Sequence, residues 1–508
     1  MAARREPARR SRSPLTAVCD DWRGVDGVLI PIAGVVAALG VALLLVVDAP
    51  PLRAIGAILA GAGGVPLVLS RTSQAQALLD RPTLLGAGIV AGVVATATLT
   101  LVFHRWPWLV VPIALVIGLR IPLRNPPSPT DHLLPLYVVL AAGVLALVIR
   151  SLRGDPPPNR LGFVGWALAA YVVIAAASLA WTADRDATAY AVAAFTLPLG
   201  LLAALTGALL PVPPLTRVLP WLLIGTALVL AVVAFWQWHL HEVFWNEKLM
   251  RTNAYGGYFR TNSLLFDPSL FGRVEALALV TIAGLLALAR PRPLLLLAAA
   301  AAVPIFLGLA TSYSQSSLVA LAAGVLVIAC VVWRWRAVIA LGAIVAVVAL
   351  GALATPQGRH LLHQPAQKAS SARLGLVQRS IDLFEAHPIQ GSGLGSFAAA
   401  TDTRKAAPHN VVAGTAAELG IIGALALLAV LLSVLWAIRH RRPDADRPTH
   451  VILAALFATI LVHALTYDTF FADPATWVIA ALLATGAGLL PLEAPGDERE
   501  WIARRAQA

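Results

Sequence analysis

Residues 370–423 read SSARLGLVQRSIDLFEAHPIQGSGLGSFAAATDTRKAAPHNVVAGTAAELGIIG, and they are the one long passage in the second half of the chain that cannot lie in lipid. Charged residues and a glycine-rich turn follow one another here, whereas long apolar runs lie on both sides. Hydrocarbon leaves charged groups and non-helical backbone without hydrogen-bond partners, so such a passage belongs at a membrane face. We therefore expect a loop that carries the working part of the protein.

The rest of the chain has the composition of a membrane protein. Of its 508 residues, 59% are hydrophobic and only 13% are charged, far from the balance of a soluble protein. Apolar runs that approach the ~20 residues needed to cross a ~30 Å hydrocarbon core recur along the whole length. The sequence therefore predicts an all-α fold, a polytopic membrane helical bundle of about 12–14 transmembrane helices, with a large extracytoplasmic loop containing short amphipathic helices.

The runs define a simple domain organisation. We expect a basic cytoplasmic tail over 1–27, a transmembrane helical domain over 28–495 and a cytoplasmic C-terminal tail over 496–508. A shorter run at 108–119 is too short to span comfortably. The predicted spans lie near 28–47, 52–70, 83–103, 133–150, 161–181, 187–210, 217–240, 269–289, 294–311, 317–333, 337–355, 410–438, 449–467 and 475–491.

Arginines in short loops predict the orientation. They gather near 150–160, 290–292, 334–336 and 439–447, and short loops rich in arginine face the cytoplasm. Residues 241–268 and 356–409 then become extracytoplasmic loops. Both termini are expected in the cytoplasm, provided that the run at 108–119 does not cross.

The two outward loops are basic, although the arginine rule places basic loops in the cytoplasm. The basic residues of these loops are Lys248, Arg251, Arg260, Arg359, Lys368, Arg373, Arg379, Arg404 and Lys405. One interpretation is an anion-binding site at the outer membrane face, and the other is solvated loop charge or contact with lipid headgroups.

The formal charge of +12 is dispersed among membrane segments rather than gathered in a soluble basic domain, so we expect no nucleic-acid partner. Two cysteines in such different settings predict neither a disulfide framework nor a cysteine metal site.

The passage 370–423 contains several recognisable elements. Residues 372–386 carry apolar side chains at helical spacing, which predicts an amphipathic helix across the mouth of the bundle. His387-Pro388 ends it, because the residue before a proline avoids the α conformation. Gly391, Gly393 and Gly395 then predict a tight turn. Without the lysine and following helix of a P-loop, a plain turn is favoured over a phosphate-binding loop.

Three polar residues mark the return into the membrane. Asn410 is placed to cap the next helix, and His409 lies before it at the outer rim. If Arg404 and Lys405 are close in space, they disfavour the imidazolium and leave a neutral ring able to accept a proton. Glu418 lies about two turns into the helix, where a carboxylate needs a partner or a cavity. Structural pairing and substrate contact both remain open for it.

Two further groups have a structural and a functional interpretation. Aromatic residues in and before the first outward loop, Trp236, Trp238, Trp245, Tyr255, Tyr258 and Phe259, are typical of an interface belt or of a sugar-stacking surface. Asp184 and Asp186 either cap a helix or hold a divalent cation against a diphosphate.

Several of these passages together resemble the O-antigen ligase and O-antigen polymerase superfamily of bacterial membrane glycosyltransferases. The similarity covers about residues 120–490. It is carried by SLAWTAD at 178–184, Arg260 with FDPSLFG at 266–272, SAR at 371–373, HPIQGSGLGSF at 387–397, HN at 409–410 and ELGIIG at 418–423.

The resemblance implies an enzyme of the bacterial cytoplasmic (inner) membrane that works in polysaccharide and cell-envelope biosynthesis. Such an enzyme transfers a glycan from a polyprenyl diphosphate carrier, such as undecaprenyl diphosphate, to a lipid, glycan or protein acceptor, with inversion and without metal or other cofactor. By this similarity His409 takes the proton of the acceptor hydroxyl, and Arg260 and Arg373 hold the diphosphate. Arg379, Asn410 and Glu418 are the remaining candidates for substrate binding.

Two alternatives compete with this interpretation. A transporter or flippase for a lipid-linked sugar or small anion would also be a bundle of about 14 helices, although internal repeats and mid-span charges are not evident. A metal-dependent membrane glycosyltransferase would use Asp184 and Asp186.

Overall fold

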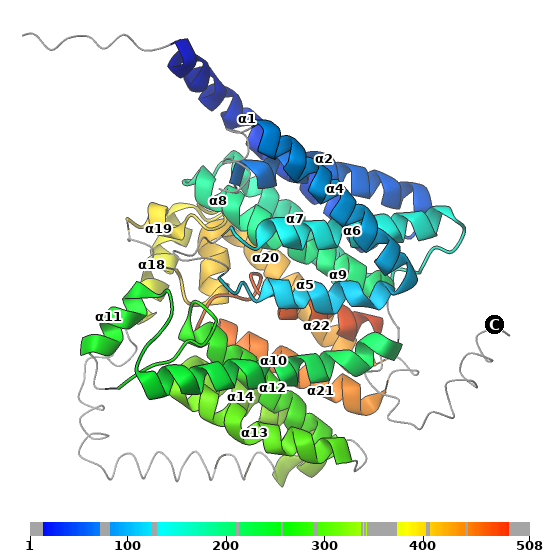
Figure 1. The fold of residues 1–508 in the computed structure, drawn as a ribbon. Helices are drawn as coiled ribbons and strands as arrows, with labels where there is room; N and C mark the ends of the chain where they lie inside the picture. Colours follow the sequence, from blue (N-terminus) through cyan, green and yellow to red (C-terminus); the bar gives the residue numbers. More distant parts are fainter. Residues whose placement is uncertain are drawn as a thin grey trace, which may run out of the picture.

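The structure is a computed structural model that describes residues 14–71, 82–122, 130–209, 213–255, 258–288, 293–336, 373–402, 407–441 and 446–486, with 339 and 342. Over these residues the secondary structure consists of helices and turns (Figure 1). Twelve of the described helices are long and apolar enough to cross a membrane. The predicted polytopic helical bundle is confirmed.

The helices follow the apolar runs closely. They are α1 Pro14–Val46, α2 Pro50–Arg71, α4 Pro82–Arg105, α5 Val110–Gly118, α6 Leu133–Leu152, α7 Gly162–Ala177, α8 Arg185–Ala191, α9 Leu197–Leu209, α10 Pro213–Leu240, α11 Glu247–Tyr255, α12 Pro268–Leu288, α13 Pro293–Ser312, α14 Gln315–Trp333, α18 Arg373–Ala386, α19 Phe397–Ala400, α20 Val411–Arg439, α21 Arg447–Ala464 and α22 Pro474–Thr485.

Two of the apolar runs form short helices. The run at 108–119 forms a single turn at Pro107–Leu109 followed by the nine-residue α5. The last described helix, α22, is also short, with 12 residues. The predicted span at 337–355 lies, apart from two single positions, outside the described residues.

The bundle has two packed groups and a cap at one end. Helices α1, α2, α6, α7 and α9 pack together, and α10, α12, α13, α14 and α21 form the second group. Between the two groups, α22 contacts α9, α20 and α21. The short helices α8, α11, α18 and α19 lie together at the left end of the bundle in Figure 1. This end carries the passage that the sequence singled out.

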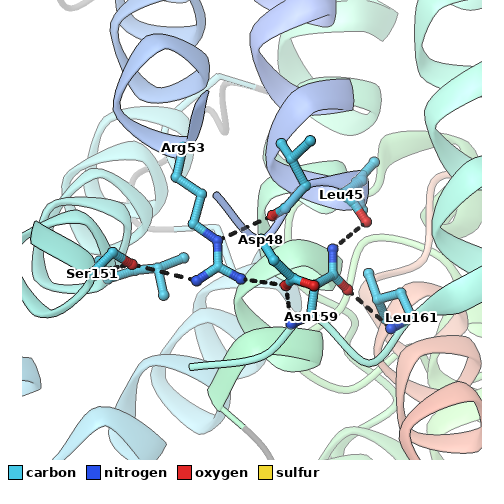
Figure 2. A network of polar contacts seen from close by, with 8 residues as sticks. Leu45, Asp48, Arg53, Ser151, Asn159 and Leu161 are labelled. Carbon is cyan, nitrogen blue, oxygen red and sulfur yellow. Dashed lines mark hydrogen bonds and ion pairs between the residues drawn. The ribbon is translucent and has the colours of Figure 1, made fainter. Parts of the chain in front are cut away.

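At the opposite end, a buried arginine ties three segments together (Figure 2). The Arg53 guanidinium is 1% exposed, and it pairs with Asp48 at 3.0 Å and donates to Ser151 Oγ at 3.3 Å and to Val47 O at 3.1 Å. The amide of Asn159 donates to Leu45 O at 2.7 Å. These contacts hold the α1–α2 turn against the connection between α6 and α7.

The direction of α1 follows from its contacts with α7. Leu179, after the end of α7, faces Gly34, whereas Gly165, near the start of α7, faces Leu45. The two helices are therefore antiparallel, and the start of α1 lies on the same face as Leu179. A cytoplasmic N-terminal tail and a cytoplasmic loop at 150–160, both predicted above, exclude each other in this arrangement.

We expect Val28→Cys, at the start of the membrane-spanning part of α1, to be labelled from the same side of the membrane as the exposed face of α18. The measurement uses a membrane-impermeant maleimide on intact cells, with Cys19→Ser and Cys330→Ser to remove the native thiols and Arg379→Cys as the reference for α18. If the two thiols are labelled from opposite sides, the antiparallel arrangement of α1 and α7 is contradicted.

Candidate functional site

The site is built on a break in helix α20. Gly420 has φ 63° and ψ −161°, so the helical hydrogen-bond pattern is interrupted there. The chain before the glycine turn fills the gap: Ile421 N donates to Pro388 O at 2.9 Å, and Ser392 N donates to Ala417 O at 3.1 Å. The broken helix and residues 388–393 therefore complete each other's backbone hydrogen bonds.

Glycine is required at the crossing points for two reasons. Gly391, Gly393 and Gly420 all have positive φ, which side chains disfavour. A Cβ on Gly420 would lie 2.2 Å from Ile389 O, and one on Gly391 would lie 2.3 Å from the backbone of Glu418. The spacing of the glycines thus reflects a close approach of two backbones.

The segment 178–184 closes the turn from the other side. The indole of Trp181 donates to Gln390 O at 3.0 Å, and Ala183 N donates to Ser392 O at 2.8 Å. Gly393 faces Thr182, with 2.2 Å between its ideal Cβ position and the threonine hydroxyl oxygen. Three passages distant in sequence therefore meet in one backbone-packed unit.

The amides of the glycine turn are already occupied. Gly393 N donates to Glu418 O at 2.7 Å, and the Glu418 carboxylate accepts from Gly395 N at 2.8 Å and Phe397 N at 3.3 Å. Leu394 N donates to Ser178 Oγ at 3.2 Å. Donors used in this way, around a carboxylate, do not form a phosphate cradle. Glu418 therefore has structural partners, which is one of the two roles that the sequence left open for it.

His409 is held at the rim by its neighbour Asn410. The Asn410 side chain accepts from Val412 N and Ala413 N, both at 3.0 Å, and donates to Leu465 O at 3.0 Å. It therefore caps α20, as predicted, and also ties α20 to the chain after α21. His409 itself has φ 56°, a strained conformation for a non-glycine residue, and its ring centroid lies 5.6 Å from that of Tyr467.

Cations converge on the pair formed by His409 and Tyr467. Arg373 and Lys248 are electrostatic neighbours of His409, and Arg260 is an electrostatic neighbour of Tyr467. Among the described residues, the Arg260 guanidinium donates through Nε to Ser312 O at 3.1 Å, and its Nη groups form no hydrogen bond or ion pair there. Arg373, half-buried at the start of α18, forms no hydrogen bond or ion pair within the described part of the chain.

Arg379 differs from these residues. It lies on the exposed face of α18, two turns after Arg373. The helix itself, predicted over 372–386, spans Arg373–Ala386 and packs Leu383 against Phe397 and Ala417. Four other basic residues of the two outward loops, Arg359, Lys368, Arg404 and Lys405, lie outside the described residues.

The surroundings of His409 favour its neutral form. Burial lowers the pKa of the imidazole from its ordinary value of 6.5, and the charges of Arg373 and Lys248 lower it further. Asp267 acts in the opposite direction. A neutral imidazole at a rim of positive charge is able to accept a proton.

The connection between α21 and α22, residues 465–473, was missed by the sequence analysis. Tyr467 hydrogen bonds with Asp267, the residue before α12. Arg273 of α12 forms a buried ion pair with Asp473 at 3.1 Å and also contacts Thr469. An arginine inside an apolar run is the signal that was available, since such charges need a specific partner.

A cavity of about 820 Å³ with a mostly apolar wall lies beside this group. Its walls come from α5, α10, α12, α21 and α22, and Pro408 and Asp468 line it next to His409 and Tyr467. Burial raises the pKa of Asp468 to about 7. The cavity is thus mostly hydrocarbon-like, with a few polar groups at the end near His409.

The remaining candidates have structural partners. Asp184 caps α8 by accepting from Asp186 N at 3.1 Å and Ala187 N at 3.0 Å, and Asp186 pairs with Arg71. Of the aromatic residues, Tyr258 packs on Tyr313 with ring centroids 4.6 Å apart. Tyr255 is 92% exposed.

Comparison with known proteins links this region to a family. A family model described as O-antigen ligase matches residues 300–428, a region that includes α18, the glycine turn, His409 and Glu418. No curated protein matches the chain.

We expect Gly420→Ala to destabilise the protein by about 1–3 kcal/mol or more, because alanine is strained at this φ and its Cβ overlaps Ile389 O. Gly225→Ala is the matched control, since an added Cβ in α10 meets open space. The measurement is the free energy of unfolding in detergent. Equal stability of the two variants would show that the break in α20 does not depend on glycine.

Proposed function

We propose that this chain is an inverting membrane glycosyltransferase. The premise is that the match at residues 300–428 makes it a member of the O-antigen ligase and polymerase superfamily. It transfers a glycan from a polyprenyl diphosphate carrier to a hydroxyl of a lipid, glycan or protein acceptor. The work takes place at the outer face of the bacterial cytoplasmic membrane, and no metal ion takes part.

The observation that carries the proposal is that unlike groups meet beside the cavity, next to its lining residues Pro408 and Asp468. An uncharged histidine, cationic groups from three segments and an apolar cavity lie together around Tyr467. A polyprenyl diphosphate has matching parts, a long apolar chain and an anionic head. Arg373 and the Nη groups of Arg260, which form no hydrogen bond or ion pair with described residues, are the donors for that head.

The transfer is a single displacement. The acceptor oxygen attacks the anomeric carbon of the sugar, and the bond from that carbon to the diphosphate oxygen breaks with its electron pair. His409 takes the proton of the acceptor hydroxyl as the new bond forms. Arg260 and Arg373 stabilise the charge that develops on the departing diphosphate. Asn410 fixes the start of α20 and so positions His409, while Glu418 keeps the glycine turn in place.

We expect His409→Ala to lower the rate of glycan transfer by about 100-fold or more, the usual contribution of a general base. Arg260→Ala and Arg373→Ala should each weaken use of the donor by about 10- to 100-fold, through loss of charge-assisted hydrogen bonds. Arg379→Ala is the matched control and should retain activity, because its side chain is exposed.

The measurement is transfer of a polyprenyl diphosphate-linked glycan to acceptor by the reconstituted protein. Full activity in both His409→Ala and Arg373→Ala would contradict the proposal. Uptake of the lipid-linked sugar into proteoliposomes without a covalent product would instead favour a transporter.

The pH dependence gives a separate check. Because the pKa of His409 is lowered, the acid limb of kcat/KM should have its midpoint below 6.5, with activity lost as the pH falls. Arg373→Gln removes a charge that lowers this pKa, so the limb should move to higher pH even where the amplitude is reduced. A limb that does not move would assign the titration to another group.

A further inference from the structure

Asp468 is an unusual residue in the wall of the cavity. The other charged residues that line it have partners: Arg120 donates to Ala472 O at 2.9 Å, Arg273 pairs with Asp473, Glu418 accepts from the glycine turn, and Asp131 has contacts of its own. Asp468 forms no hydrogen bond or ion pair with any described residue. An unpaired carboxylate in a mostly apolar wall is unfavourable unless water or a ligand satisfies it.

The position of Asp468 is next to the proposed base. The ideal Cβ position of Gly414 lies 2.5 Å from Asp468 Oδ2 and 2.6 Å from the ring of Pro408, the residue before His409. Gly414, one turn into α20, thus leaves the space that the carboxylate occupies. Asp468 lines the cavity, and it directly follows Tyr467, whose ring lies next to that of His409.

The charges around Asp468 restrict the ligand. Glu418 of α20 and the hydroxyl of Tyr171 of α7 are its electrostatic neighbours, and neither brings a positive charge. A phosphate is repelled by two carboxylates, whereas a neutral hydroxyl is a good donor to a carboxylate oxygen. The diphosphate therefore belongs with Arg260 and Arg373, and an uncharged polyol belongs with Asp468.

We propose that Asp468 binds a hydroxyl group of the sugar that is bonded to the donor diphosphate and thereby contributes to recognition of that sugar. The inference rests on the proposed function, because it takes the arginines as the diphosphate site. It adds a sugar-recognising residue from the α21–α22 connection, a segment that lies outside the family match at residues 300–428.

The test compares two probes on the full-length protein in detergent. One is farnesyl diphosphate, and the other is farnesyl diphosphate esterified to glucose, galactose or N-acetylglucosamine. At pH 8, above the raised pKa of Asp468, at least one sugar ester should bind the unmodified protein about 10-fold more tightly than farnesyl diphosphate, as expected for one hydrogen bond to a charged acceptor. In Asp468→Ala this advantage should disappear, while farnesyl diphosphate binds as before. Asp382→Asn, on the exposed face of α18, is the control for loss of one negative charge.

The outcomes separate the two proposals. If Asp468→Ala keeps the advantage of the sugar ester, or if both probes lose affinity equally, the role of Asp468 is contradicted. The same holds if no sugar ester binds the unmodified protein more tightly than farnesyl diphosphate. If neither probe binds, the proposed diphosphate site fails, and the role of Asp468 fails with it.

Discussion

The site depends on the pairing of residues 388–393 with the broken turn of α20 at Gly420. A helix interrupted at membrane depth exposes amides and carbonyls that lipid cannot satisfy. Here backbone groups of the glycine turn form hydrogen bonds with them, and these bonds also hold the turn in place against α20. Because Trp181 and Ala183 bond to the same turn, α7, α18 and α20 are joined at one level of the bundle. The part of the cavity near Glu418 and the position of His409 before α20 both depend on this junction.

The two ends of the bundle are held differently. At one end Arg53 closes the α1–α2 turn with buried ionic and polar contacts, which leave little freedom. At the other end His409 is kept in a strained backbone conformation between the Asn410 cap and Tyr467. Strain of this kind persists only where the surroundings over-determine it. The Asn410 cap, its hydrogen bond to Leu465 O and the ring contact with Tyr467 are the surroundings that hold His409 in this conformation.

Local patterns gave the parts of this structure that local forces decide. The helix after Ser371, its end before His387-Pro388, the Asn410 cap and the Asp184 cap were all predictable, because each depends on residues within a few positions. The 465–473 connection was not, since Tyr467, Asp468 and Thr469 matter only through contacts with α12 and α20. The direction of α1 could not be obtained by counting charged residues in loops either, because the result depends on whether the short α5 crosses the membrane. The glycines were visible as a turn, but their common cause, a close approach of two backbones, required the structure.

Arg373 has no hydrogen-bond or ion-pair partner among the described residues, and this has a consequence for turnover on the proposed mechanism. The donor is a diphosphate diester, and the leaving lipid is a monoester that carries additional negative charge above about pH 6. An arginine that no carboxylate neutralises attracts the more highly charged species more strongly. At the arginines alone the spent carrier therefore competes with the loaded one, and any advantage of the loaded carrier has to come from contacts with its sugar. Continued operation requires an enzyme class that removes phosphate from the spent lipid and keeps its concentration low in the membrane.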